Sequence, residues 1–113
     1  MKVGAHVSTA GGLDKAIDRA QEMSAEAIQI FPSSPRSWAF KPIPPTVTTA
    51  FLEKAESAGI GPIFLHGIYL VSLGAPTEEN LDKSVQALIN YMEVARDIGA
   101  AGVIFHTGSH RGV

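Results

Sequence analysis

The sequence predicts an α/β fold built on four parallel strands, and two observations lead to this prediction. First, four short apolar segments alternate with stretches in which apolar residues recur every three or four positions, as in amphipathic helices. Second, residues 57–66 resemble residues 97–106, since both pass from Gly through small residues to an apolar run that ends in His. Such alternation indicates parallel strands joined by right-handed crossovers.

The strands are expected at residues 2–6, 27–31, 62–66 and 102–106, where the apolar runs lie. These runs are apolar enough to be buried on both faces, as parallel strands usually are. The first helix is expected after Gly11-Gly12, which favours a tight turn because the spacing of a nucleotide-binding glycine motif is missing. Its apolar face would consist of Leu13, Ala16, Ile17 and Ala20.

The second helix is predicted at residues 45–58, because Pro45 suits a first helical turn and Gly59 suits a left-handed cap. The third is predicted to start after Thr77, a good N-cap, and to end before Gly99. The predicted buried face of this helix comprises Leu81, Val85, Leu88, Ile89, Met92 and Ala95.

The composition supports one packed domain over residues 1–113, with 45% hydrophobic and 18% charged residues and no linker-like segment. Cysteine is absent, which excludes disulfides, thiolate catalysis and thiolate-bound metal. No apolar run is long enough for a signal peptide or a membrane span, so a cytoplasmic protein is expected. The formal net charge of −2 gives no overall attraction to nucleic acid.

Three of the four predicted strands end in histidine: His6, His66 and His106. Ligands of parallel α/β folds bind at the carboxyl ends of strands, and neutral imidazole is a good ligand for zinc. One such histidine alone would be read as structural, but three at the same phase of a repeating unit favour a metal site. Because the acidic residues lie almost wholly on predicted helices, the remaining ligands would have to come from elsewhere.

Two loops near the same strand ends carry Arg36, Trp38, Tyr69 and Leu70. One interpretation is a hydrophobic cluster at the rim of the sheet. The other is a surface that combines phosphate contacts from Arg with stacking or wedging against bases. The residues alone favour neither interpretation. His110 lies in a polar loop, where it could orient a metal ligand, but the residues alone favour exposure to solvent.

Several separated motifs together resemble the endonuclease IV family, the apurinic/apyrimidinic endonuclease family 2. In order, they are Gly4-Ala5-His6-Val7-Ser8 with Gly11-Gly12, Pro35-Arg36-Ser37-Trp38, His66 with Tyr69-Leu70, and Phe105-His106-Thr107-Gly108-Ser109-His110. The resemblance extends over essentially the whole chain. It implies that the parallel (β/α) units form the N-terminal part, about half, of a TIM barrel.

The resemblance also implies an activity, which is zinc-dependent hydrolysis of the DNA phosphodiester on the 5′ side of abasic sites. The family typically holds three zinc ions. By the resemblance, His66 and His106 bind one zinc together with a carboxylate from a later strand, while Arg36, Tyr69 and Leu70 contact double-stranded DNA at the abasic gap. His6 would orient the metal ligands without binding metal itself, and the position of His110 suggests the same role. No catalytic residue is implied beyond the metal ligands.

We therefore expect an N-terminal fragment that lacks most metal ligands and is inactive alone. Two alternatives remain open. A sugar isomerase or epimerase of the xylose isomerase-like barrels would share the histidines at the strand ends, although the motifs at Arg36 and Tyr69-Leu70 favour the nuclease. A non-catalytic half-barrel is the other. Four parallel strands leave two open sheet edges, which predicts self-association.

Overall fold

The computed structural model describes residues 1–108, and its four strands form one parallel sheet in chain order. The strands are β1 (Gly4–His6), β2 (Ala27–Ile30), β3 (Ile63–His66) and β4 (Gly102–Ile104). The predicted α/β class and the parallel order are confirmed. Each strand is one or two residues shorter than predicted, and β4 ends two residues before His106.

The helices are α1 (Lys15–Glu22), α2 (Pro45–Ala58) and α3 (Glu78–Ile98), and the last two have the predicted bounds. The Thr77 hydroxyl accepts a hydrogen bond from the backbone N–H of Asn80 at 3.3 Å, which confirms the predicted N-cap. Gly59 and Gly99 end α2 and α3 with φ angles of 66° and 68°. This left-handed conformation is open to glycine at little cost, as predicted.

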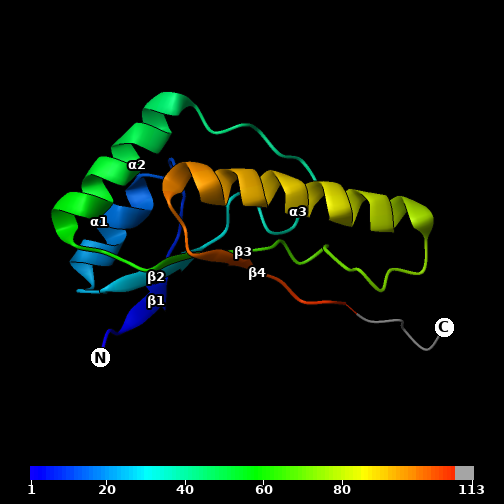
Figure 1. Cartoon of the computed structure of the whole chain (residues 1–113), viewed down its shortest axis with the longest axis horizontal. Helices are drawn as coiled ribbons and strands as arrows, with labels where there is room; N and C mark the ends of the chain where they lie inside the picture. Colours follow the sequence, from blue (N-terminus) through cyan, green and yellow to red (C-terminus); the bar gives the residue numbers. More distant parts are fainter. Residues whose placement is uncertain (109–113) are drawn as a thin grey trace.

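The three helices cover one face of the sheet (Figure 1). Alternate strand residues point toward them: Ile28, Ile30, Ile63 and Leu65 are buried. Their main partners on the helices are Ile17, Phe51 and Ile98, each at most 1% exposed. The opposite face, which carries Gln29, Phe64 and Ile104, is covered by no element within residues 1–108, so the prediction of strands buried on both faces was wrong.

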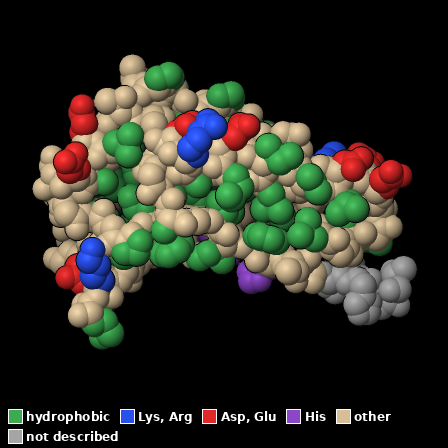
Figure 2. Space-filling model, in the orientation of Figure 1, with side chains coloured by type: hydrophobic (Ala, Val, Ile, Leu, Met, Phe, Trp, Pro, Cys, Tyr) green, Lys and Arg blue, Asp and Glu red, His purple; other side chains and the backbone are tan. Residues whose placement is uncertain are grey.

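The predicted buried face of α3 was also wrong. Of its six residues only Ala95 is buried, whereas Val85, Ile89 and Met92 are 44%, 47% and 58% exposed. The residues that α3 does bury lie about one position away around the helix: Ser84, Ala87, Tyr91, Val94, Ala95 and Ile98. Val85, Ile89 and Met92 therefore belong to an exposed apolar surface, and hydrophobic side chains gather over α3 in Figure 2.

A second, smaller hydrophobic cluster holds the long loops that follow β2 and β3. Its buried members are Ile68, Val71, Ala87 and Tyr91, and Trp38 packs against them. The hydroxyl of Tyr91 also lies 3.3 Å from that of Ser33, a hydrogen-bonding distance. The two loops are thus fixed against α3 rather than extended into solvent. Within the described residues, no helix is both long and apolar enough to cross a membrane.

Candidate metal centre and nucleic-acid interface

His66 and His106 lie side by side at the carboxyl edge of the sheet. Their ring centroids are 5.3 Å apart, with an angle of 54° between the ring planes. The strands β3 and β4 pair in parallel, so the residues that follow them meet at one edge. The backbone N–H of Gly67 then donates to the Ile104 carbonyl at 2.7 Å, which continues the pairing beyond β3. The expected proximity of the two imidazoles is therefore present.

The ring of His66 is oriented by the backbone of the next residue. Its Nδ1 atom lies 2.6 Å from the carbonyl oxygen of Gly67. Because a carbonyl oxygen only accepts, the proton of the neutral ring is on Nδ1, and Nε2 of this form has a free lone pair. This is the arrangement that metal-binding histidines usually adopt, with one nitrogen donating to a carbonyl and the other free for the metal.

His6 has the opposite arrangement. Its Nδ1 atom lies 3.0 Å from Nε2 of Gln29, the residue directly across from it on β2. An amide nitrogen only donates, so the Nδ1 atom of His6 accepts and the ring proton of the neutral form is on Nε2. Partial desolvation lowers the pKa of His6, and the nearby His66 imidazole lowers it further. His6 is therefore neutral at neutral pH and presents a donor.

Phe31 lies between the histidines and was not singled out from the sequence. Its ring centroid is 4.7 Å from that of His6, 5.4 Å from that of His66 and 5.4 Å from that of Tyr69, all in edge-to-face geometry. It thus separates His6 from the pair formed by His66 and His106. The available signal was its position directly after β2, at the same phase as the strand-end histidines.

The predicted DNA-facing residues lie beside this edge. Tyr69 and Leu70 are 62% and 39% exposed, and Arg36 is also exposed. The backbone N–H of Tyr69 donates to the carbonyl of Pro35 at 2.9 Å, which joins the loop of Arg36 to the loop of Tyr69. Trp38, in contrast, is half-buried against the smaller cluster. Trp38 therefore fits the interpretation of a hydrophobic cluster at the rim, whereas Arg36, Tyr69 and Leu70 remain accessible to a partner.

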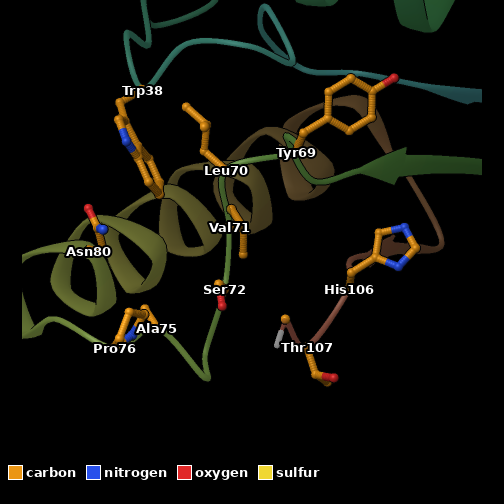
Figure 3. A pocket seen from close by; sticks show the side chains of 11 residues that line it. Trp38, Tyr69, Leu70, Val71, Ser72, Ala75, Pro76, Asn80, His106 and Thr107 are labelled. Atoms are coloured by element: carbon orange, nitrogen blue, oxygen red, sulfur yellow. The ribbon is translucent and has the colours of Figure 1, made fainter. Parts of the chain in front are cut away.

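A pocket of about 510 Å³ brings the two loops and His106 together. Figure 3 shows Trp38 and Asn80 on one side of it and His106 on the other, with Leu70 and Tyr69 above. The pocket thus places exposed apolar and aromatic side chains next to the histidine pair. His110, the remaining predicted site residue, lies outside the described residues.

The histidine pair fits a zinc ion as a partial ligand set. Ring centroids 5.3 Å apart allow one nitrogen of each imidazole to approach a shared ion at about 2.1 Å. Within residues 1–108, however, no three His, Cys, Asp or Glu side chains gather closely enough to hold a metal. Catalytic zinc usually has three protein ligands, so this pair is one part of a site.

Comparison with known proteins identifies the family. The family model of xylose isomerase-like TIM barrels matches residues 17–113. The chain is 34% identical over 112 residues to the probable endonuclease 4 of Chloroflexus aurantiacus, a match that covers 99% of this chain and 39% of that protein. It is 41% identical over 111 residues to the probable endonuclease 4 of Streptomyces coelicolor, covering 97% and 37%.

Among solved structures, endonuclease IV from Thermus thermophilus superposes with a TM-score of 0.91 at 38% identity. The superposition covers 96% of this chain and 41% of the Thermus chain. The chain thus spans about two-fifths of the length of these relatives. Its four parallel strands and three helices correspond to one part of their barrel, and the chain belongs to the family of xylose isomerase-like TIM barrels.

Proposed function

We propose that this chain supplies one part of the active site of a DNA-repair endonuclease that cleaves on the 5′ side of abasic sites. The observation that carries the proposal is the His66–His106 pair, which lies beside the exposed Tyr69 and Leu70 at one sheet edge. The relatives that match nearly the whole chain are named endonuclease 4, which supports a DNA substrate. A DNA substrate also accords with the expected cytoplasmic location.

In this proposal His66 and His106 bind one of the zinc ions through ring nitrogens. His66 is prepared for this role, since its Nδ1–H is already held by the Gly67 carbonyl. When bound, zinc supplies Lewis acidity toward a phosphate oxygen and a lowered pKa for a coordinated water. The remaining ligands would come from protein segments that the relatives have and that this chain does not span.

The loop residues would recognise the damaged duplex. Arg36 is exposed and carries a charge suited to a phosphate. Tyr69 and Leu70 project from a loop that two contacts hold in place, the backbone bond to Pro35 and the packing of Ile68 in the smaller cluster. Side chains of this kind can enter a minor groove and fill the space left by a missing base.

A sugar isomerase or epimerase is less well supported as the function. The histidine pair suits either chemistry, but an exposed tyrosine and leucine on a fixed loop suit a duplex better than a small polyol. The curated relatives at 34% and 41% identity also carry the endonuclease name. A non-catalytic role for the isolated chain remains part of the proposal, because two imidazoles do not complete a zinc site.

A chimaera tests the proposal. Residues 1–113 would replace the matching segment of Thermus thermophilus endonuclease IV, to which this chain is 38% identical. We expect zinc-dependent incision of a duplex with one abasic site, and no incision of the undamaged duplex. The substitutions His66→Ala and His106→Ala should abolish incision, whereas Tyr69→Ala should weaken binding of the abasic duplex.

The matched control is Leu52→Ala, which alters an exposed side chain of α2 away from the site. A chimaera that is folded by circular dichroism and loaded with zinc, yet cleaves no abasic duplex, would contradict the proposal. Should the chimaera fail to fold, binding of abasic duplex by the chain itself provides the second measurement. Equal affinity of the chain for abasic and undamaged duplex, unchanged by Tyr69→Ala, would then count against it.

A further inference from the structure

The two histidines on either side of Phe31 present different groups at their Nε2 atoms. His66 presents a lone pair, because its Nδ1–H donates to the Gly67 carbonyl. His6 presents an N–H, because its Nδ1 accepts from the side-chain amide of Gln29. A lone pair suits a metal ion, whereas an N–H suits an anionic oxygen. The difference arises from one neighbour of each ring.

Gln29 is held in place by the sheet itself. It lies directly opposite His6 in the β1–β2 register, and its other neighbour in the sheet is Phe64 of β3. The backbone of the pair is fixed further, since the N–H of Val7 donates to the Gln29 carbonyl at 3.0 Å. The amide of Gln29 therefore reaches the His6 ring from a rigid strand.

The His6 ring lines a cavity of about 410 Å³ that is separate from the pocket at His106. Its other lining residues include Ser8, Thr9, Ser33 and Ser34, and none of the residues that line it is acidic. The Ser8 hydroxyl oxygen accepts from the backbone N–H of Ala10 at 3.1 Å, so its own proton remains free to donate. Two residues that line the cavity thus carry donors that these contacts leave unused, His6 Nε2–H and Ser8 Oγ–H.

The loop segment that carries Ser8 is held in place by Arg19 of α1. The guanidinium of Arg19 donates to the carbonyl oxygens of Ser8 and Ala10 at 2.9 and 2.7 Å. The Thr9 hydroxyl also donates to the carbonyl of Phe31 at 3.5 Å, which links the same loop to the end of β2. Donors on a pre-ordered loop bind an oxyanion with little loss of conformational entropy.

We propose that Gln29 is a positioning residue that fixes His6 as an Nε2–H donor to a phosphate oxygen. The assignment of that phosphate to the DNA backbone rests on the proposed function, but the role of Gln29 toward His6 does not. Gln29 touches no substrate in this account. It acts through His6 by disfavouring the other tautomer. In that tautomer Nε2 would have a free lone pair and could bind a metal.

The decisive measurement is the tautomer of His6 in the whole chain, without any ligand. Long-range proton–nitrogen correlation spectra of uniformly ¹⁵N-labelled protein distinguish a protonated ring nitrogen from an unprotonated one, and His6→Gln assigns the signals. We expect the proton of His6 on Nε2 and that of His66 on Nδ1. A His6 proton on Nδ1 in the unsubstituted protein would overturn the proposal, whatever the variants do.

Two substitutions test whether Gln29 is the cause. Gln29→Glu is nearly isosteric but accepts instead of donating, so it should move the His6 proton to Nδ1. Gln29→Leu removes the donor without adding charge and should leave a mixture of the two tautomers. The matched control is Gln86→Glu, because Gln86 also donates from its amide, to Asn90 at 3.1 Å, on the exposed surface of α3. An unchanged His6 tautomer in both Gln29 variants would overturn the proposal.

Inorganic phosphate and an undamaged duplex serve as probes of the donor. Both should perturb the His6 ring signals of the unsubstituted protein, and Gln29→Leu should weaken the apparent phosphate affinity in proportion to the fraction of His6 that loses the Nε2 proton, about twofold for an equal mixture of tautomers. Equal perturbation in Gln29→Leu would mean an adventitious ion only and would overturn the donor role. If the tautomer and phosphate results hold but abasic duplex does not bind, the proposed function fails and the role of Gln29 stands.

Discussion

The imidazoles of His66 and His106 come to within 5.3 Å of each other, centroid to centroid, although 40 residues separate them in the chain (106 minus 66). The contact is a direct consequence of parallel pairing between β3 and β4, which brings the ends of both strands to one edge. Phe31 packs edge-to-face against His66 and restricts its ring from the other side. The pair is therefore oriented before any ligand arrives.

From this geometry we predict that the chain binds zinc weakly and that both histidines are required. His66→Ala or His106→Ala should each weaken zinc affinity about tenfold or more, since loss of a supporting group alone costs that much. The measurement is isothermal titration calorimetry with zinc chloride. His6→Ala is the matched control, because His6 presents a proton rather than a lone pair, and it should bind zinc as the unsubstituted chain does. Zinc affinity that is insensitive to both alanine substitutions would contradict the prediction.

The isolated chain is expected to have no incision activity. Within the described residues only two histidines approach a common point, whereas a catalytic zinc site needs at least three protein ligands. The test is incubation of zinc-loaded protein with a labelled abasic-site duplex, followed by denaturing electrophoresis, with endonuclease IV from Thermus thermophilus as positive control. Zinc-dependent incision above the buffer blank would show that the prediction is wrong.

Stability should depend on the core between the helices and the covered face of the sheet. Phe51 on α2 is completely buried there, while its neighbour Leu52 is 42% exposed. Phe51→Ala should lower the free energy of unfolding by about 3–5 kcal/mol, from lost burial and the cavity left behind. Leu52→Ala, the control, should cost about 1 kcal/mol or less. Urea denaturation followed by circular dichroism measures both, and equal midpoints for the two variants would be inconsistent with this core.

The ends of β1 and β3 at His6 and His66 could be predicted from the sequence, but the contacts between the strand ends could not. The positions of His6, His66 and His106 follow from the repeated phase of strand and helix, which is local information. The pairing of His6 with Gln29 depends instead on the register between β1 and β2, which a sequence pattern does not contain. The place of Phe31 between His6 and His66 depends on this register and on the one between β2 and β3.

The error on α3 has a different physical cause. Its large apolar residues predicted a buried stripe, but the N-terminal half of the helix packs against the loop after β3 with small residues, Ser84 and Ala87, which are 0% and 7% exposed. Small side chains allow close approach of the backbone yet give a weak hydrophobic signal. The buried hydroxyl of Ser84 is satisfied locally, since it donates to the Asn80 carbonyl at 2.8 Å and accepts from the N–H of Ser72 at 2.9 Å.

Tyr91 should make the chain less stable at high pH. Burial raises the pKa of its phenol, and the hydrogen bond with Ser33 offsets part of that rise. A group whose pKa is raised on folding stabilises the folded state fully below its unfolded pKa, about 10, and loses this contribution as pH rises through the folded value. The free energy of unfolding should therefore fall above pH 10.

Tyr91→Phe isolates this effect. At neutral pH the variant should be destabilised by about 0.5–1.5 kcal/mol through loss of the Ser33 hydrogen bond. Above pH 10 its stability should fall less steeply than that of the unsubstituted chain, because no phenol ionises at position 91. Urea denaturation over a pH series measures the two slopes, with Tyr69→Phe as control because Tyr69 is 62% exposed. Parallel pH dependences for Tyr91→Phe and the unsubstituted chain would contradict the assignment.

The chain is also expected to self-associate, for two structural reasons. The sheet ends at β1 and β4, each paired on one side only, and its face opposite the helices is uncovered within residues 1–108. In addition, Val85, Leu88, Ile89 and Met92 line an apolar groove of about 430 Å³ on the outside of α3. Parallel sheets are normally covered on both faces and closed or protected at their edges. A second copy of the chain offers matching edges and a matching apolar face.

Two substitutions separate these surfaces in sedimentation velocity experiments. Ile104→Lys places a charge on the uncovered sheet face, where Ile104 is 43% exposed, and Met92→Lys places one in the groove on α3. If copies associate through the sheet, Ile104→Lys should shift the distribution toward monomer and Met92→Lys should change it little. If they associate through α3, Met92→Lys should shift it toward monomer and Ile104→Lys should change it little. Gln86→Lys adds the same charge to an exposed position of α3 outside the groove and is the control. An unsubstituted chain that stays monomeric as its concentration rises would refute the expectation, because burial of either surface in a partner should favour association at high concentration.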